Sequence, residues 1–282
     1  MADRAAADAV GKPRAAVDPE PDLGAVRGTE PVVRRSGTGQ PVVYLPGAQL
    51  AGHWLPFHDE LAKQVDLIVP EHPGFGSIER PAWLDDFADL ALYYDELLDT
   101  LELDGVHLVG HSVGGWIAAE FAVFYPKRVK SLTLIAPMGL RVPGHPLYDV
   151  FRMTEENAAS VLLNGDAAAY GELELTATSV EARVAAYDEF TTLARLMWNP
   201  RYDLKLDQRL DRVRCPALIV VPDEDRVVPA AHMERWVELL PDARLETVSG
   251  GTSPTGHLLV AQEPERTAAT IASFLAGVGA GS

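Results

Sequence analysis

A serine lies inside a short glycine-rich motif at residues 110–115, which read GHSVGG. The motif follows the apolar run 106–109 and precedes a second apolar stretch, so it joins a predicted buried strand to a predicted helix. So tight a turn pushes the Ser112 hydroxyl out above a sheet, and Gly110 and Gly114 must lack side chains because the backbones approach closely. The motif predicts a serine nucleophile; a glycine-rich turn with a capping serine is the alternative.

A serine hydroxyl needs a base, and an imidazole base needs a carboxylate that orients it. Of the eight histidines, His257 is the best placed, because it follows a glycine-rich loop at 250–256 after the last predicted strand. Three consecutive acids at 223–225 follow the predicted strand 217–221. Because parallel sheets bind ligands at the carboxyl ends of their strands, we expect both loops at the site. The residues alone leave the choice among the three acids open.

Four features together resemble the α/β-hydrolase superfamily, in its capped esterase, lactonase and C–C hydrolase branch. They are the motif at 110–115, PGFG at 73–76 after a strand, DEDRVVP at 223–229, and Gly-His at 256–257 followed by EPE at 263–265. The order of nucleophile, acid and histidine along the chain is also the order of that family. The resemblance extends from about residue 30 to residue 275 and implies a Ser-His-Asp triad with an oxyanion hole.

The resemblance singles out one of the three acids. In the family, the aspartate of this loop usually stands four residues before a proline, so Pro229 implies that Asp225 orients His257. The loop before His257 departs from the family pattern, because it is a few residues longer than the usual glycine-rich form. We expect that difference to reshape the rim of the pocket without disturbing the triad.

The resemblance also implies where a negatively charged oxygen would be held. One donor comes from the start of the helix after the serine, and the second comes from the loop after the predicted strand 42–45. The match assigns these two roles to the N–H groups of Val113 and Ala48. Family members usually have His-Gly in the second loop, whereas this chain has Pro-Gly at 46–47.

These residues imply an ester- or lactone-cleaving serine hydrolase that works through an acyl-enzyme on Ser112. Related dehalogenases and epoxide hydrolases carry aspartate in place of the serine, so those reactions are disfavoured. One alternative is a C–C bond hydrolase of ring-fission products, although a tryptophan often follows the histidine in that branch and Leu258 stands here. The other is a ligand receptor or binding protein on the same scaffold.

Short apolar runs that alternate with amphipathic helices must position these residues. This alternation predicts an α/β fold, with a mostly parallel central sheet and helices on both faces. The predicted strands are 32–33, 42–45, 65–69, 106–109, 132–136, 217–221 and 243–248. The predicted helices are 84–101, one that follows the serine motif through about Phe124, one from about 230 to 240, and one that starts at Pro264.

The alternation breaks between residues 138 and 210, where several short helices are expected. We interpret 138–210 as a helical cap, 23–137 and 211–282 as the α/β-hydrolase core, and 1–22 as a disordered leader. Some apolar side chains of the cap must face the sheet, so the predicted substrate is a medium-sized, mainly apolar small molecule. The candidates are Tyr148, Phe151, Met153, Tyr170, Tyr187, Phe190, Met197 and Trp198.

Charge and composition restrict the partners. The formal charge is −17, from 24 Lys and Arg against 41 Asp and Glu, and such a surface repels nucleic acid and acidic membranes. No apolar stretch approaches the roughly 20 residues of a membrane span, and residues 1–22 lack the apolar run of a signal peptide. A cytoplasmic location is therefore the default expectation. The spacing of the cysteine, histidines and acidic residues does not predict a metal site, and no cofactor is expected. The oligomeric state cannot be predicted from the sequence.

Overall fold

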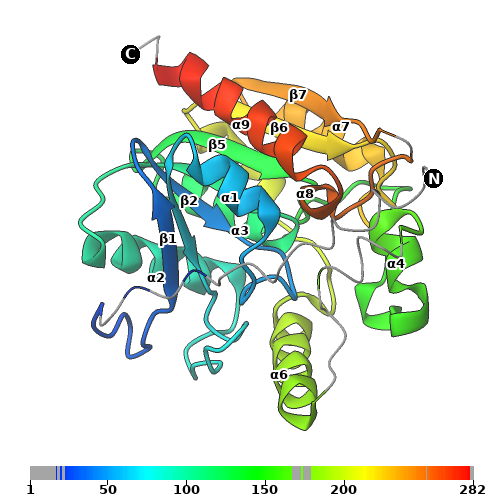
Figure 1. The fold of residues 1–282 in the computed structure, drawn as a ribbon, viewed down its shortest axis with the longest axis horizontal. Helices are drawn as coiled ribbons and strands as arrows, with labels where there is room; N and C mark the ends of the chain where they lie inside the picture. Colours follow the sequence, from blue (N-terminus) through cyan, green and yellow to red (C-terminus); the bar gives the residue numbers. More distant parts are fainter. Residues whose placement is uncertain are drawn as a thin grey trace, which may run out of the picture.

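A seven-stranded sheet forms the centre of the computed structural model, which describes Val17, Glu20, residues 23–166, Leu173, 179–251 and 253–279. The strand order is β1-β3-β2-β4-β5-β6-β7 (Figure 1). β1 runs antiparallel to β3, and the other neighbouring strands are parallel. The strands are β1 (Val33–Gly37), β2 (Pro41–Leu45), β3 (Asp66–Pro70), β4 (Val106–His111), β5 (Val129–Ile135), β6 (Ala217–Pro222) and β7 (Ala243–Val248).

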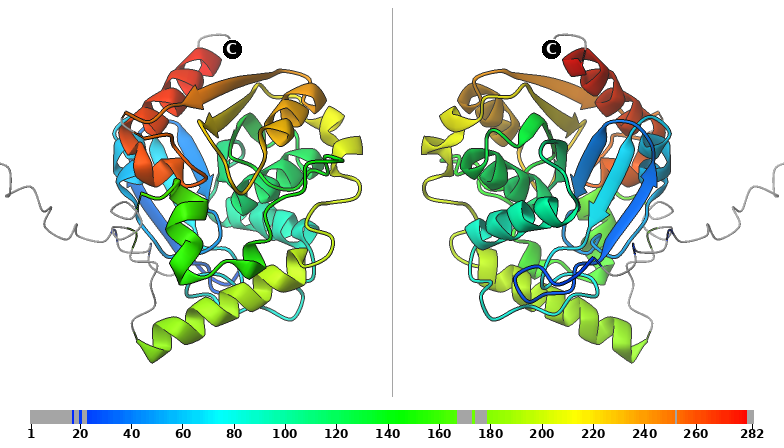
Figure 2. Two further views of the ribbon diagram at one scale, coloured as in Figure 1. Left: turned by 90° about the vertical axis from the view of Figure 1, so that its right-hand side faces the viewer. Right: turned by 90° about the vertical axis from the view of Figure 1, so that its left-hand side faces the viewer.

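Helices cover both faces of this sheet, which confirms the predicted fold class. α1 (Pro56–Ala62) and α9 (Pro264–Gly279) pack together on one face, and α2 (Phe87–Thr100) packs with α3 (Val113–Phe124) on the other (Figure 2). α7 (Ala230–Leu239) lies on the same side as α3. Every residue of β4 and β6 is buried, because helices exclude water from both faces of these central strands.

Local sequence sets where these helices begin. The Asp86 side chain accepts a hydrogen bond from the Asp89 N–H at 3.0 Å, and the Asp89 side chain accepts one from the Asp86 N–H at 3.2 Å. This reciprocal cap starts α2 at Phe87, three residues after the predicted start. α9 begins at Pro264 as predicted, since a proline is well tolerated in the first turn of a helix.

The strand order creates a crevice at one edge of the sheet. After β2 the chain forms β3 on one side of it, and then crosses to form β4 on the other side. The loops that leave β2 and β4 therefore turn away from each other at their carboxyl ends, where open α/β sheets bind ligands. The motif at 110–115 and the loop at 46–49 both lie at this point.

Between β5 and β6, the described residues form helices and one isolated bridge, from Gly139 to Tyr202. We call residues 138–210 the inserted segment; its assignment as a cap stays a prediction. The Leu162 carbonyl in α4 accepts the N–H of Leu258, and Glu189 in α6 accepts the N–H of Gln49, so two helices contact loops of the sheet. The helical elements are η1 (Val150–Arg152), α4 (Glu155–Leu163), α6 (Val180–Met197), η2 (Leu206–Gln208) and η3 (Leu210–Arg212).

Two predictions concern residues that lie largely outside the described part of the chain. The leader at 1–22 lies outside the described residues except for Val17 and Glu20, and Tyr170 lies outside them as well. Of the helices that the structure describes, none has the length and apolar character to cross a membrane.

His58 in α1 couples the stability of this fold to pH. Its side chain is fully buried, and its Nδ1 accepts the N–H of Leu55 at 3.0 Å. Burial lowers the pKa of His58 to about 3, with smaller contributions from Arg34 and His53. In the unfolded chain the imidazole takes up a proton near pH 6.5. The stability that depends on neutral His58 is therefore present above pH 6.5 and is lost as the pH falls toward the folded pKa.

Replacing His58 with Gln, whose amide oxygen can accept the same N–H, should make the free energy of unfolding less dependent on pH. Between about pH 6 and pH 4, the free energy of unfolding of the wild type should change with pH by about 1.4 kcal/mol per pH unit more than that of the variant. The reason is that unfolding of the variant takes up one proton fewer than unfolding of the wild type. Urea unfolding at several pH values measures both slopes. Parallel slopes would mean that the folded protein protonates His58.

Candidate active site

The backbone at Ser112 makes a sharp turn between β4 and α3. Ser112 has φ 55° and ψ −115°, a backbone conformation that residues other than glycine rarely adopt. Its N–H donates to the Ile135 carbonyl at 2.9 Å, and its own carbonyl accepts the N–H groups of Trp116 and Met138 at 3.2 and 3.1 Å. These bonds hold the unusual conformation in place, at the carboxyl edge of the sheet.

The glycines around this turn are required by close backbone approaches. A Cβ on Gly110 would overlap the carbonyl oxygen of Gly114, and a Cβ on Gly114 would overlap the carbonyl oxygen of Leu45 in β2. The second overlap involves a neighbouring strand, so Gly114 must lack a side chain because the turn packs against the end of β2. This arrangement agrees with the geometry expected from the motif at 110–115.

Three predicted residues form one continuous hydrogen-bonded chain. Nε2 of His257 lies 2.8 Å from Oγ of Ser112, and Nδ1 of His257 lies 2.9 Å from Oδ2 of Asp225. The His257 and Asp225 side chains are only 4% and 5% exposed. With the proton on Nδ1 donated to the carboxylate, Nε2 accepts the hydrogen bond of the serine hydroxyl. The arrangement can withdraw the hydroxyl proton as the serine oxygen attacks an electrophile.

The three acids at 223–225 have different positions. Oδ1 of Asp225 also accepts the N–H groups of Val227 and Val228, at 2.8 and 2.9 Å, which orients the carboxylate toward His257. Glu224 is exposed and pairs with Arg226 at 3.2 Å. Asp225 is therefore the acid that contacts the imidazole, as the resemblance implied.

Asp223 fastens the loop that carries the histidine. Its Oδ2 accepts the N–H groups of Gly250 at 2.9 Å and Thr255 at 3.1 Å. Partial burial raises the pKa of Asp223, but hydrogen bonds from Ser249, Gly250 and Thr255 outweigh it and hold the pKa below its ordinary value. The long glycine-rich loop is thus tied to the loop after β6, close to His257.

The loop after β2 is fixed at its first residue by a buried histidine. Nε2 of His72 donates to the Pro46 carbonyl at 2.8 Å, while Nδ1 pairs with the Tyr94 hydroxyl. Burial lowers the pKa of His72 to about 4, so the ring is neutral near pH 7. Among the hydrogen bonds of the described residues, none has the N–H of Ala48 or Val113 as donor. Both groups are therefore available to a ligand, and their oxyanion role is a proposal.

His111 supports the backbone of the histidine loop. Nε2 of His111 donates to the carbonyl of His257 at 2.9 Å, and burial lowers the pKa of His111 to about 3. The neutral ring leaves Nδ1 as an acceptor, which has no partner among the described residues. Nδ1 lies beside Gly47, where an added Cβ would come within 2.8 Å of it.

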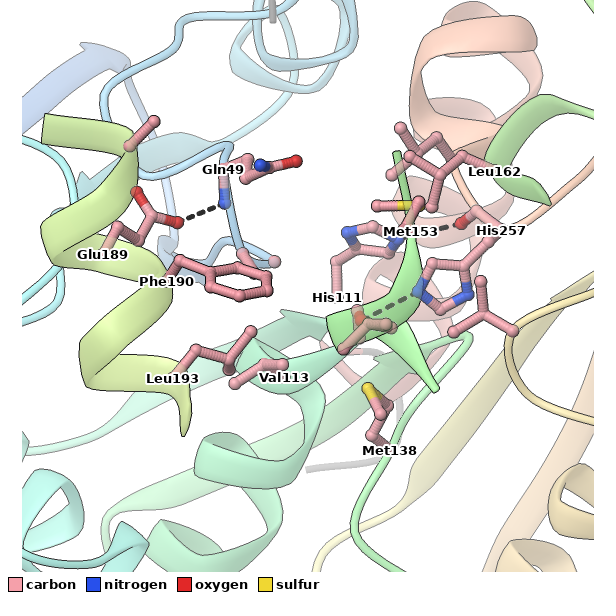
Figure 3. Close-up of a pocket in the computed structure, with 17 residues that line it drawn as sticks. Gln49, His111, Val113, Met138, Met153, Leu162, Glu189, Phe190, Leu193 and His257 are labelled. Carbon is pink, nitrogen blue, oxygen red and sulfur yellow. Dashed lines mark hydrogen bonds between the residues drawn. The ribbon is translucent and has the colours of Figure 1, made fainter. Parts of the chain in front are cut away.

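A cavity of about 60 Å³ lies over Ser112 (Figure 3). It is bounded by the loop after β2, the loop that carries His257, and the inserted segment. Met153 and Phe190 are the two predicted aromatic or methionine side chains that line it. Tyr187 and Trp198 are 70% and 60% exposed, so these two do not face the site. Most of the other lining is apolar and comes from Val113, Met138, Val150, Leu162, Ala186, Leu193, Val227 and Leu258.

One charged residue of this cavity has no counterpart in the sequence-based interpretation. Glu189 in α6 is 8% exposed, and its carboxylate accepts the N–H groups of Gln49 and Gly76. Burial raises the pKa of Glu189, while these two hydrogen bonds lower it and the nearby Glu71 raises it further. Glu189 stands four and eight positions before the buried Leu193 and Met197, so helical spacing places it on the buried face of α6. Its hydrogen-bond partners are more than a hundred positions away, and local sequence gives no signal for them.

Comparison with known proteins shows the family to which this chain belongs. A family model described as "Alpha/beta hydrolase family" matches residues 42–270. The 2-hydroxy-6-oxo-2,4-heptadienoate hydrolase of Pseudomonas putida is 27% identical over 239 residues, which cover 77% of this chain and 84% of that protein. A monoacylglycerol lipase of Mus musculus is 24% identical, over 80% of this chain and 72% of its own.

Solved structures show the same fold. A serine hydrolase involved in carbazole degradation superimposes with a TM-score of 0.71 at 24% sequence identity, covering 89% of this chain and 96% of its own. An esterase from Thermogutta terrifontis gives a TM-score of 0.70 at 22% identity, with coverages of 90% and 96%. The family match spans most of the chain and agrees with the sheet order and helix placement described above. The chain belongs to the alpha/beta hydrolase family, and the protein is a hydrolase.

Proposed function

We propose that the protein hydrolyses an uncharged carboxylic ester or lactone through an acyl-enzyme on Ser112. The observation that carries the proposal is the hydrogen-bonded chain from Asp225 through His257 to Ser112. Ser112 and His257 line the cavity, and Asp225 contacts the His257 ring nitrogen that faces away from Ser112. The family supports hydrolysis in general, and the local chemistry supports the serine mechanism.

In the first half of the reaction, His257 accepts the Ser112 proton at Nε2 while Oγ forms a bond to the carbonyl carbon. Asp225 keeps the Nδ1 proton in place and stabilises the imidazolium that forms. The carbonyl oxygen becomes negatively charged and is held by the N–H groups of Ala48 and Val113. His257 then gives its proton to the departing alcohol, and the acyl group remains on the serine.

In the second half, His257 takes a proton from a water molecule, which attacks the acyl carbon. The tetrahedral intermediate collapses, the proton on His257 returns to Ser112, and a carboxylic acid is released. At neutral pH the product is an anion. Because the cavity also contains the carboxylate of Glu189, repulsion between like charges favours departure of this product.

The charges of the cavity favour a neutral substrate over a carboxylate-bearing one. Among the described lining residues, Glu189 is the one acidic residue, and none is Arg or Lys. Glu189 contacts the loop after β2, at residues 46–49, which we call the oxyanion loop. The Pseudomonas putida relative is named for a dienoate, which is a carboxylate. Proteins bind carboxylates mainly through Arg, Lys or exposed N–H groups, and an unpaired anion beside Glu189 would be repelled. This observation supports ester or lactone hydrolysis over the C–C bond alternative.

The size of the cavity limits the acyl part of the substrate. A volume of about 60 Å³ is far below the several hundred Å³ of a typical ligand pocket. A cavity of this size accepts a short acyl group over Ser112, and a medium-sized substrate requires the inserted segment to move as a cap. The apolar lining agrees with the apolar substrate expected from the sequence.

A fluorophosphonate probe should attach one covalent label, at Ser112. Turnover of 4-nitrophenyl acetate and butyrate should fall by at least about 10⁴-fold in Ser112→Ala and in His257→Ala, because nucleophile and base act as one unit. Mass spectrometry of the labelled peptide and ester kinetics are the measurements. A folded protein that is neither labelled nor active would instead support the ligand-binding alternative.

Two asparagine substitutions should separate the acids of the loop after β6. Asp225→Asn should reduce kcat by up to about 10⁴-fold, because an amide at this position favours the wrong tautomer of His257. Asp223→Asn loosens the histidine loop without contacting the ring, so the loss should be about tenfold. Equal losses in both variants, measured under the same ester assay, would contradict the assignment of Asp225.

A pair of esters that differ only in charge tests the proposed preference. The 4-nitrophenyl ester of hexanoate should be hydrolysed with a kcat/KM about tenfold or more above that of the 4-nitrophenyl monoester of adipate. The reason is that the free carboxylate of the adipate monoester is repelled by the carboxylate of Glu189. Glu189→Gln should narrow this ratio by removing the charge while keeping the shape. A preference for the adipate monoester in the wild type would favour a carboxylate-bearing substrate instead.

A further inference from the structure

Glu189 links the inserted segment to two loops of the sheet. It lies in the middle of α6, and its carboxylate accepts one N–H from the loop after β2, at Gln49, and one from the loop after β3, at Gly76, the latter at 3.3 Å. Figure 3 shows the Glu189–Gln49 contact on the side of the cavity opposite His257. The hydroxyls of Thr191 and Thr192, by contrast, donate to carbonyls within α6 itself.

A carboxylate is an unfavourable choice for a position this deeply buried. Desolvation disfavours its charged form, and Glu71, itself 1% exposed, adds a second negative charge nearby. Replacing a buried ionic group with a well-packed apolar residue is often neutral or stabilising for a fold. Packing of α6 against the sheet therefore does not by itself explain a glutamate here. Its two N–H partners provide the specific interaction.

The loop that Glu189 contacts carries backbone strain. Gln49 has φ 64°, in the left-handed region that residues with side chains seldom occupy. Such a conformation persists only where surrounding contacts hold it. His72 holds the loop at the Pro46 carbonyl, and Glu189 holds it at the N–H of Gln49. Ala48 lies between these two attachment points.

We propose that Glu189 is a positioning residue for the oxyanion loop, which it holds through Gln49 so that the Ala48 N–H is aligned over Ser112. The proposal rests on the function proposed above, which assigns Ala48 its oxyanion role. The N–H that Glu189 accepts belongs to the peptide that joins Ala48 to Gln49, so release of that peptide frees Ala48 to rotate. The oxyanion hole is then complete only while α6 is docked on the sheet. Docking of the cap and competence for catalysis are thereby coupled.

Three substitutions of Glu189 distinguish alignment from charge. Glu189→Gln keeps the length and one acceptor oxygen but loses the charge. Glu189→Asp keeps the charge but is one methylene shorter and cannot reach both N–H groups. Glu189→Ala removes the contact. Asp188→Asn is the matched control, because Asp188 is an exposed neighbour in the same helix.

Positioning requires kcat for neutral esters to fall in the order wild type, Gln, then Asp and Ala together. The Asp and Ala variants should lose about 10- to 100-fold in kcat, with KM changed less than about threefold, because a misaligned oxyanion donor affects the transition state more than the bound substrate. Affinity for an aryl boronic acid, which forms a tetrahedral adduct with the serine, should fall by the same factor as kcat/KM. The control should match the wild type in all three values. An Asp variant more active than the Gln variant would overturn positioning in favour of a role for the charge.

Amide hydrogen exchange tests the contact without reference to turnover. Peptides that cover residues 46–50 should exchange at least about tenfold faster in Glu189→Asp and Glu189→Ala than in the wild type, while peptides from β4 should be unchanged. Wild-type exchange in both variants would overturn the proposal even if Ser112→Ala abolishes ester turnover. Conversely, full turnover in Ser112→Ala would refute the proposed function, and faster exchange at 46–50 would still show that Glu189 holds the loop.

Discussion

The turn at Ser112 is the constraint to which the other parts of the site must conform. Its backbone is held in a left-handed conformation by hydrogen bonds to β5 and to the segment after it, and Gly114 lets the turn lie directly against β2. The position of Oγ is consequently set by the sheet and not by the rotation of a flexible loop. A base and an oxyanion donor can serve this hydroxyl only if they arrive at the same edge, and the reversal of strand order beside β2 provides the space for them.

Two aspartates in one short loop divide the work of presenting His257. Asp225 contacts the ring, and its own orientation is fixed by two backbone N–H groups. Asp223 contacts the histidine loop away from the ring, at the N–H groups of Gly250 and Thr255 and at the Thr255 hydroxyl. The extra length of that loop is therefore compatible with a fixed imidazole, because Asp223 binds the loop at Gly250 and at Thr255, close to the ring.

Relatives with this fold carry names that refer to different substrates, so the fold alone does not select one. In the proposed function, selection depends on the inserted segment, which supplies Met153, Leu162, Phe190 and the carboxyl group of Glu189 to the cavity. A short apolar cavity with a buried negative charge suits a neutral acyl group and disfavours an anionic substrate. The same carboxylate contacts the loop after β2, so the two proposals assign substrate choice and catalytic alignment to one side chain.

The sequence by itself determined those features that depend on neighbouring residues. Strand β7 occupies the predicted residues 243–248, α9 starts at the predicted Pro264, and the strand–turn–helix at Ser112 has the expected form, because apolar periodicity, helix-start signals and glycine spacing act locally. The residue types suited to a nucleophile, a base and an acid were also identifiable, although the choice of Asp225 over its neighbours required the family resemblance.

Only the tertiary structure decided which side chains contact one another across the cavity. Glu189 and Gln49 are 140 residues apart, and the spacing of Glu189 to the buried Leu193 and Met197 indicates a buried helix face without indicating its partner. The different tasks of Asp223 and Asp225 likewise depend on where the loop after β7 returns to the sheet. Burial and partnership between distant segments are set by the packing of the whole chain, and local patterns of sequence do not encode them.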